Sequence, residues 1–274
     1  LSSDVKFKNL CLLIIDDEQR FGVKQKEKLR EKNPALDILS LSATPIPRTI
    51  YMALSSFKNI SLVQTPPKGR MAIKTRVKPY SKITILKAID FEIKRKGQIY
   101  FLHNRVDTLE KTKKDLEKLV PTARISIIHG KMKENQIVKI MDDFQNQKTD
   151  ILLATTIIEN GIDLPNVNTI IIEDATKLGL AQAHQIRGRV GRSDKEGIAY
   201  FLYESKNLTG LAKERLKALQ DAKELGSGYK IAIKDLELRG AGNILGKEQS
   251  GAINKIGLNL YSQILSEAIE KMRN

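Results

Sequence analysis

The sequence has one cysteine, no tryptophan and no long run of apolar residues. Because Cys11 has no second cysteine to pair with, the chain forms no internal disulfide, which fits a reducing cytoplasm. Aromatic residues make up only 5% of the chain, which argues against a platform that stacks single-stranded bases. No stretch approaches the roughly 18 apolar residues of a membrane-spanning helix, and residues 1–10 lack an apolar stretch of signal-peptide length. We therefore predict a cytoplasmic protein with no membrane partner.

The composition indicates a folded, basic protein. The 274 residues are 41% hydrophobic and 29% charged, which excludes a wholly disordered chain and allows one large domain or two small ones. Lys and Arg number 47 against 32 Asp and Glu, a formal net charge of +15. Such a charge attracts polyanions such as nucleic acid or an acidic membrane surface, although many lysine-rich surfaces are simply solvated.

Short apolar runs alternate with amphipathic stretches along the chain. We predict strands at residues 10–15, 38–41, 60–64, 72–78, 98–102, 124–128, 150–154, 168–173 and 197–203. We predict helices at residues 21–32, 46–55, 82–95, 106–119, 133–145, 180–187, 209–224 and 256–272, with a glycine-rich turn region at 238–251. This alternation is typical of an α/β fold with a parallel sheet and helices on both faces. Ligands of such sheets bind at the carboxyl ends of the strands.

Two polar segments follow the first two apolar runs. Asp16, Asp17 and Glu18 come directly after the apolar run that ends at Ile15. Adjacent carboxylates at a strand end can hold Mg²⁺ and orient an attacking water, although acidic turns at strand ends are common. The second segment, residues 42–48 (SATPIPR), follows the next apolar run. Its hydroxyls could sense a phosphate, or could cap a helix that begins with proline.

Arginines and glycines alternate in the segment Gln185-Ile-Arg-Gly-Arg-Val-Gly-Arg192. Arg187, Arg189 and Arg192 are predicted to form a compact cationic surface, because guanidinium groups bind phosphate with two donors and stay charged. The glycines let the backbone approach a ligand closely. The alternative is a basic surface loop without a ligand.

The order of these segments resembles the motif order of superfamily 2 helicases and translocases. Asn104 after the run 98–102, His129-Gly130 after the run 124–128, and residues 154–163 (ATTIIENGID) resemble further motifs of that family. The resemblance implies a RecA-like fold in which ATP and Mg²⁺ lie between two lobes.

The resemblance also implies roles for individual residues. Asp16 matches the Mg²⁺-binding acid, and Asp17 stands where the family usually has the glutamate that polarises the attacking water. This departure shortens the carboxylate by one methylene, so we expect weaker or altered water activation. Ser42 and Thr44 match the motif that couples nucleotide state to lobe movement.

Other matched positions face the nucleotide from the second lobe. Arg189 and Arg192 match arginines offered to the γ-phosphate, and Arg192 is the better finger candidate. Gln185 matches a nucleotide-sensing position, and Gly161 and Asp163 match a motif that lines the cleft.

The resemblance assigns the remaining motif residues to DNA. Asn104, His129, Gly130 and either Thr155 or Thr156 are expected to contact the DNA backbone, which needs no base readout.

The tail carries a further resemblance. Residues 235–251 (DLELRGAGNILGKEQSG) resemble the TRG motif shared by RecG branch-migration helicases and bacterial transcription-repair coupling factors. The sequences of the tail and of residues 17–23 are more similar to the second group. Arg239 and Gln249 are the residues that would couple hydrolysis to translocation.

The phosphate-binding pattern G-x-x-x-x-G-K-[ST] occurs nowhere in the chain, and residues 242–248 have the wrong spacing for it. With the prolines and glycine of residues 65–70 as a linker, we predict three parts. Residues 1–65 are the C-terminal part of a first RecA-like lobe, 66–203 are the second lobe, and 204–274 are a helical TRG tail. This chain alone should hydrolyse ATP negligibly.

The predicted function is that of a motor fragment of an ATP-dependent double-stranded DNA translocase in transcription-coupled repair. In that interpretation, RNA polymerase and UvrA bind the parent protein outside these residues. One alternative is a RecG-like enzyme that remodels replication forks, and another is a non-catalytic DNA-binding module.

Overall fold

The computed structural model describes residues 8–16, 36–42, 61–63, 65, 71–155, 164–222 and 227–239. The chain divides into two compact units, one made of residues 1–61 and 239–274 and the other of residues Leu62–Leu238. Each unit is described by itself.

The first unit contains a two-stranded parallel sheet. Strand β1 (Leu12–Ile15) pairs with β2 (Asp37–Ser40) in a register that places Ile15 opposite Ser40. The backbone N–H of Leu41 donates to the carbonyl of Ile15 at 2.8 Å, so the pairing extends to the carboxyl end of the strands. Both strands lie where the apolar runs predicted them.

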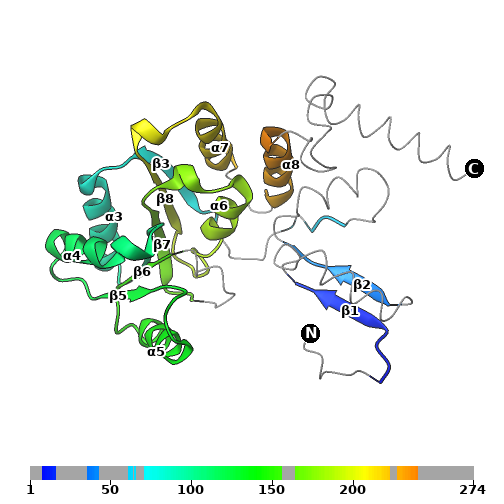
Figure 1. Ribbon diagram of the computed structural model, residues 1–274, viewed down its shortest axis with the longest axis horizontal. Helices are drawn as coiled ribbons and strands as arrows, with labels where there is room; N and C mark the ends of the chain where they lie inside the picture. The colour runs from blue at the N-terminus through cyan, green and yellow to red at the C-terminus, as the bar shows by residue number, and fades with distance from the viewer. Residues whose placement is uncertain are drawn as a thin grey trace, which may run out of the picture. The chain divides into compact units, whose positions relative to one another are not determined.

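The second unit is built on a six-stranded sheet in which every described pairing is parallel (Figure 1). The strand order is β3-β8-β7-β4-β6-β5. The strands are β3 (Lys74–Pro79), β4 (Gln98–Leu102), β5 (Ile125–Ile128), β6 (Ile151–Ala154), β7 (Val167–Ile172) and β8 (Ile198–Tyr203). This sheet confirms the predicted parallel α/β fold.

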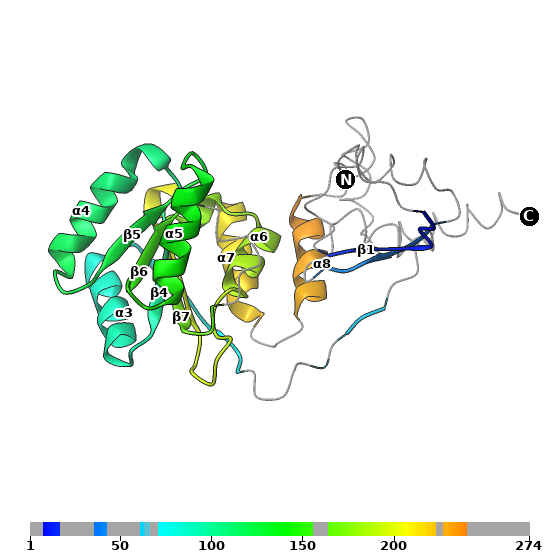
Figure 2. The same ribbon diagram turned by 90° about the horizontal axis from the view of Figure 1, so that it is seen from below.

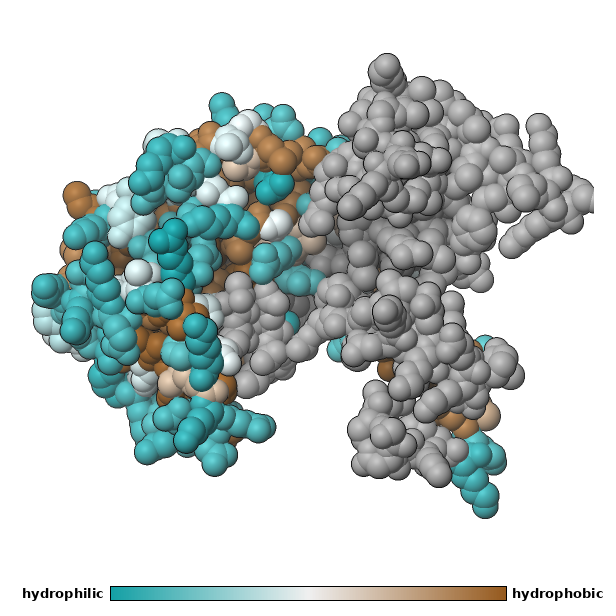
Figure 3. Space-filling model, in the orientation of Figure 1, coloured by the Kyte–Doolittle hydropathy of each residue, from teal (hydrophilic) through white to brown (hydrophobic). Residues whose placement is uncertain are grey.

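Helices cover both faces of this sheet. They are α3 (Lys82–Lys94), α4 (Leu109–Leu119), α5 (Glu134–Gln145), α6 (Leu180–Arg187), α7 (Gly210–Asp221) and α8 (Gly228–Arg239). Figure 2 shows α3 and α4 on one side of the strands and α6 and α7 on the other. The surface over α4 and α5 in Figure 3 is mostly hydrophilic, as expected for helices that turn one face to solvent.

The core consists of two apolar layers separated by the sheet. In β4, Ile99 and Phe101 belong to the layer under α3 and α4, whereas Tyr100 and Leu102 belong to the opposite layer with α6 and α7. All five residues of β4 are buried. Alternate side chains of a strand point to opposite faces, so a strand covered on both sides has a continuous apolar sequence. This burial explains why the central strands were easy to predict.

Three differences from the predicted elements involve local turns. Residues 61–63, inside a predicted strand, form no regular structure. The predicted helix 106–119 begins as a 3₁₀ turn, Val106–Thr108, before α4. Helix α8 lies in a stretch for which no helix or strand was predicted. Nevertheless Ile231 and Ala232 of α8 are buried.

The predicted helices 21–32, 46–55 and 256–272 lie outside the described residues. No helix in the described part of the chain is long and apolar enough to cross a membrane.

Candidate nucleotide and nucleic-acid sites

In the first unit, two predicted site residues follow neighbouring strands. Asp16 comes directly after β1, and Ser42 lies two residues after β2. Since β1 and β2 are parallel and in register, both residues lie at the same carboxyl end of this small sheet. The geometry therefore brings together the acidic and hydroxyl segments that the sequence singled out.

Several predicted site residues lie outside the described residues. They are Asp17, Thr44, Thr156, Gly161, Asp163 and Gln249. Arg239 is the last residue of α8, and only its backbone is described.

In the second unit, the end of α6 positions the residues of the arginine segment. Gln185 lies on the helix and is half-buried, and the half-buried Arg189 follows the helix in a tight turn. The N–H of Arg189 donates to the carbonyl of Ile186 at 3.1 Å, which continues the helical path by one turn. Gln185 and Arg189, four positions apart, therefore lie on the same side of this segment.

The backbone conformation at position 191 accounts for one glycine of the segment. Its φ of +69° is in the left-handed region that favours glycine. A Cβ atom on Gly197 would lie 2.8 Å from the Cα of Gly191, so the two backbones approach too closely for side chains. The left-handed turn directs the chain into Arg192, which is half-buried.

Arg187 corrects the prediction of three phosphate-facing arginines. Its side chain is only 5% exposed. Nη1 donates to the carbonyls of Leu219 at 3.0 Å and Ala222 at 2.7 Å, at the C-terminus of α7. A cation at a helix C-terminus satisfies carbonyls that have no partner within the helix. Arg187 therefore fastens α6 to α7, and Arg189 and Arg192 remain as the phosphate candidates.

His184 shares this buried site. Burial, together with the neighbouring Arg187, lowers the pKa of His184 from 6.5 to about 4. Burial also lowers the pKa of Arg187 to about 10, so the guanidinium stays charged at neutral pH. Nη2 of Arg187 donates to Nδ1 of the neutral His184 at 2.8 Å.

Three predicted DNA contacts lie on adjacent strands. Asn104 follows β4, Thr155 follows β6 and His129 follows β5, in the spatial order of the sheet. Neighbouring strands are about 4.8 Å apart, so the three residues form a short row at the carboxyl edge, with the exposed Gly130 next to His129. The side-chain amide of Asn104 donates to the carbonyl of Asp174 at 2.9 Å, which fixes its orientation.

The sequence analysis missed a polar cluster on the same edge. Nδ1 of His103 pairs with the carboxylate of Glu173, and Nε2 of His103 is 2.6 Å from the hydroxyl of Thr108. His103 and Glu173 each follow an apolar strand directly, and this position is a signal by which they could have been found. The cluster packs β4 against β7 beside the row of predicted DNA contacts.

The arginine segment lies at the amino ends of the strands, opposite the carboxyl ends that carry the predicted DNA contacts. It connects α6 to the beginning of β8, and Gly191 contacts Gly197 just before that strand. The residues that follow Asp163 also lie at this edge, since the carbonyl of Asn166 accepts from the N–H of Gln98 at the start of β4. The rule that ligands gather at carboxyl ends therefore fits Asp16 and Ser42 but not Arg189 and Arg192.

Comparisons with known proteins agree with this geometry. Residues 81–194 match the helicase conserved C-terminal domain. The whole chain is 49% identical to the transcription-repair-coupling factor of Bacillus subtilis and 47% identical to that of Staphylococcus aureus. Over its whole length, the chain is thus similar to a segment of the transcription-repair-coupling factors. It spans about a quarter of these relatives, 23% and 24% of their length.

A solved structure is similar as well. The structure of RecG bound to a three-way DNA junction aligns with 96% of this chain and 34% of RecG, at 31% identity and a TM-score of 0.69. The RecA-like helicase fold of the second unit is thus shared with both groups that the tail resembles. The higher identity over the full chain is with the transcription-repair-coupling factors.

Proposed function

We propose that these 274 residues are part of the motor of a longer protein, an ATP-dependent double-stranded DNA translocase that acts in transcription-coupled repair. The observation that carries the proposal is the 49% identity, over all 274 residues of this chain, to a segment of a transcription-repair-coupling factor. The placement of arginines at one edge of the second sheet and of strand-end polar residues at the other supports it. Below, "the parent protein" means that longer protein.

The residues of the first unit fit a nucleotide-bound Mg²⁺. Proteins usually hold Mg²⁺ with one or two carboxylates plus substrate phosphates, and Asp16 at a strand end beside Ser42 offers that donor set. Mg²⁺-bound ATP would supply the phosphoryl group whose transfer to water releases free energy. Asp16 would hold the ion and Asp17 would orient the water. Ser42 and Thr44 would respond to the nucleotide state.

The second unit would contact the nucleotide through its arginine segment. Phosphoryl transfer depends mainly on positioning and on stabilising charge. Arg189 and Arg192 would bring positive charge to the γ-phosphate when the lobes close. Gln185, Gly161 and Asp163 would contribute to the same side of the cleft.

The carboxyl edge of the second unit would contact duplex DNA. Asn104, His129, Gly130 and either Thr155 or Thr156 offer small polar groups and main-chain amides, which suit phosphates without reading bases. Arg105, Lys131 and Lys133 are exposed near these residues and add positive charge. The tail residues Arg239 and Gln249 would couple hydrolysis to movement along DNA.

The proposed role in transcription-coupled repair rests on the similarity to transcription-repair-coupling factors. The parent protein would displace stalled RNA polymerase and recruit excision repair through UvrA, with both partners binding outside this chain. RecG-like fork remodelling is the second candidate, favoured by the similarity to RecG bound to a three-way junction. A DNA-binding module without catalysis is the third candidate. The half-buried Arg189 and Arg192, on either side of the left-handed turn at Gly191, argue against it.

Hydrolysis and displacement assays test the proposal. ATP hydrolysis by the purified parent protein should rise on addition of linear duplex DNA, whereas this chain alone should stay at background. The parent protein should release a stalled transcription complex faster than it regresses a model fork. Fork regression without release would favour the RecG-like candidate. DNA binding without ATP hydrolysis would favour the non-catalytic module.

A further inference from the structure

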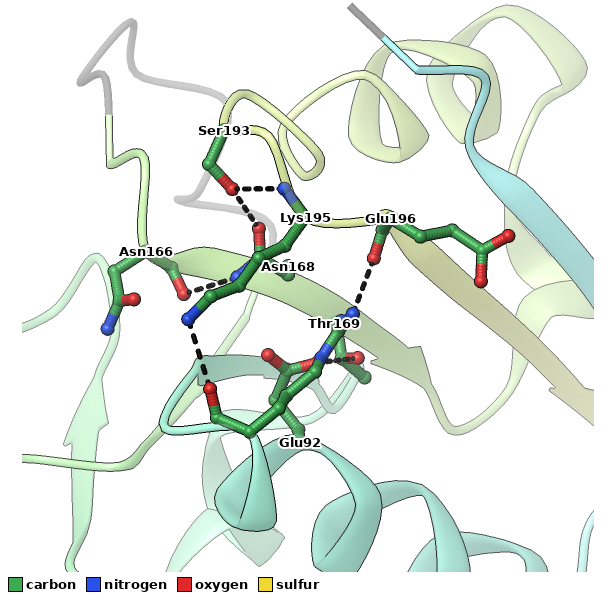
Figure 4. Close-up of polar contacts among 8 residues, drawn as sticks. Glu92, Asn166, Asn168, Thr169, Ser193, Lys195 and Glu196 are labelled. Atoms are coloured by element: carbon green, nitrogen blue, oxygen red, sulfur yellow. Dashed lines mark hydrogen bonds and ion pairs between the residues drawn. The ribbon is translucent and has the colours of Figure 1, made fainter.

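The segment after the candidate finger arginine is fastened to two other parts of the second unit. We call residues 192–197, between Arg192 and β8, the finger loop. Figure 4 shows its contacts at the amino-terminal edge of the sheet, with the end of α3 on one side and the start of β7 on the other. None of these contacts belongs to the motifs identified in the sequence.

The first connection joins the finger loop to the start of β7. The hydroxyl of Ser193 donates to Oδ1 of Asn168 at 2.7 Å, and Nδ2 of Asn168 donates to the carbonyl of Asn166 at 3.1 Å (Figure 4). The same hydroxyl accepts from the N–H of Lys195 at 3.3 Å. Asn168 is fully buried. One amide side chain thus links the loop to the residues that enter β7.

The second connection joins the loop to the C-terminus of α3. Nη1 of Arg95 donates to the carbonyl of Glu196 at 2.9 Å, and Nζ of Lys195 donates to the carbonyl of Arg95 at 3.0 Å. The two cations therefore make reciprocal contacts with each other's segment. Lys195 also satisfies a carbonyl at a helix C-terminus, where positive charge is favoured.

A buried carboxylate holds Arg95 in place. Glu92 is 0% exposed, and its Oε2 accepts from Nε of Arg95 at 3.0 Å and from the hydroxyl of Thr169 on β7. Breaking a buried ion pair leaves an uncompensated charge, which is strongly destabilising. Glu92, itself held by Thr169 of β7, therefore fixes the orientation in which Arg95 meets the finger loop.

These contacts lie close in the chain to two residues proposed to face the nucleotide, Arg192 and Asp163. Ser193 is the residue after Arg192, and Asn166 is three residues after Asp163. The side chain of Asn168 thus forms a polar bridge between the finger loop and the residues that enter β7. Asn168 itself is fully buried, and its two hydrogen bonds are partly buried.

We propose that Ser193 and Asn168 are positioning residues that hold the finger loop against β7, so that Arg192 meets the γ-phosphate in one geometry. This inference rests on the proposed function, since it concerns hydrolysis at the same site. Neither residue touches the reacting atoms. ATP hydrolysis is faster when the loop that carries a phosphate-binding side chain is already ordered, because less entropy is lost in the transition state.

Single-turnover ATP hydrolysis by the duplex-bound parent protein tests the inference. Ser193→Ala removes the hydrogen bond to Asn168 and the longer one from the N–H of Lys195. It should lower the hydrolysis rate about fivefold to tenfold, the size of one neutral hydrogen bond. The apparent KM for ATP and the affinity for duplex DNA should change less than about twofold, because neither depends on Arg192 geometry alone. Ser193→Thr keeps the hydroxyl and should restore most of the rate.

Ser126→Ala is the matched control. The hydroxyl of Ser126 also makes one side-chain hydrogen bond, 2.9 Å to Thr149, but on β5 at the far end of the strand order. This variant should keep the wild-type rate. Lys195→Met, which removes the contact with α3, is a second test and should reduce the rate in the same way as Ser193→Ala.

Combination with Arg192→Ala separates positioning from general damage. If Ser193 acts through Arg192, adding Ser193→Ala to Arg192→Ala should lower the remaining rate by less than about twofold. An unchanged rate in Ser193→Ala, an equal loss in Ser126→Ala, or a full additional loss in the double variant would each overturn the inference. A wild-type parent protein without DNA-stimulated hydrolysis would instead overturn the proposed function, and this inference with it.

Discussion

Replacing Arg187 by alanine should destabilise the chain strongly although the residue lies inside a motif of phosphate-binding arginines. The side chain is 5% exposed and donates to two carbonyls at the end of α7, at 3.0 and 2.7 Å, and to His184 at 2.8 Å. Arg187→Ala removes these contacts, together with longer ones from Nη1 to the hydroxyl of Thr75 and from Nη2 to the hydroxyl of Ser227, both at 3.4 Å.

The magnitude follows from these contacts. Hydrogen bonds that involve a charged group contribute about 1.5–3 kcal/mol each. Part of that sum is offset because the variant no longer buries a guanidinium. We expect a net loss of about 2–4 kcal/mol in the free energy of unfolding, which is roughly 6–12 °C in Tm for a domain of this size.

Urea denaturation of the 274-residue chain at pH 7, followed by circular dichroism, measures this loss. Arg189→Ala and Arg192→Ala are the controls, and each should cost about 1 kcal/mol or less, since both side chains are half-buried and lie outside the α6–α7 contact. The interpretation of Arg187 would be refuted if Arg187→Ala unfolded within about 0.5 kcal/mol of wild type, or if all three variants lost the same stability.

Three further predictions concern stability. Because the pKa of His184 is lowered to about 4, the unfolded chain takes up this proton first. Native stability should therefore fall by roughly 3 kcal/mol as the pH falls from about 6.5 to 4, and His184→Gln should flatten that slope in urea titrations at several pH values. Gly191→Ala places a side chain at a φ of +69° with its Cβ 3.1 Å from Gly197, and should lower the unfolding free energy by about 1–3 kcal/mol in thermal melts; an unchanged Tm would show that the turn is not constrained. Gly97→Ala would put a Cβ 1.6 Å from the buried Glu92 carboxylate, so we expect a loss of at least about 2 kcal/mol, and wild-type stability would mean that the Glu92–Arg95 pair shifts easily.

The central sheet could be predicted from the sequence because its strands are covered on both sides. Strand β4 is buried along its whole length, and after Gln98 its residues 99–102 form an uninterrupted apolar run. Helix α8 could not be predicted in the same way. The buried side of α8 carries Asp235 as well as Ile231 and Ala232, so its apolar pattern is interrupted by a charged residue.

The arginine segment is a place where the sequence pattern and the structure differ. Arg187 lies seven residues after Leu180 and four after Ala183, on the buried side of α6. That periodicity could have separated Arg187 from Arg189 in advance. The order of motifs, by contrast, predicted the two groups of proteins to which the chain is similar.

The network around the finger loop could not be predicted. Arg95, Asn168 and Ser193 are far apart in the chain, and they meet only because the ends of neighbouring elements converge at one edge of the sheet. Strand order is not encoded in local periodicity, so contacts of this kind require the folded structure.

The rate of duplex-stimulated ATP hydrolysis by the parent protein, compared between wild type and Arg192→Ala, tests the central claim most directly. A finger arginine stabilises the charge of the transition state, and its removal costs about a thousandfold or more in rate. We predict a loss of that size, with ATP and duplex DNA still bound to within several-fold of wild type. Hydrolysis at the wild-type rate in Arg192→Ala would contradict the claim that this segment supplies the finger of a DNA motor.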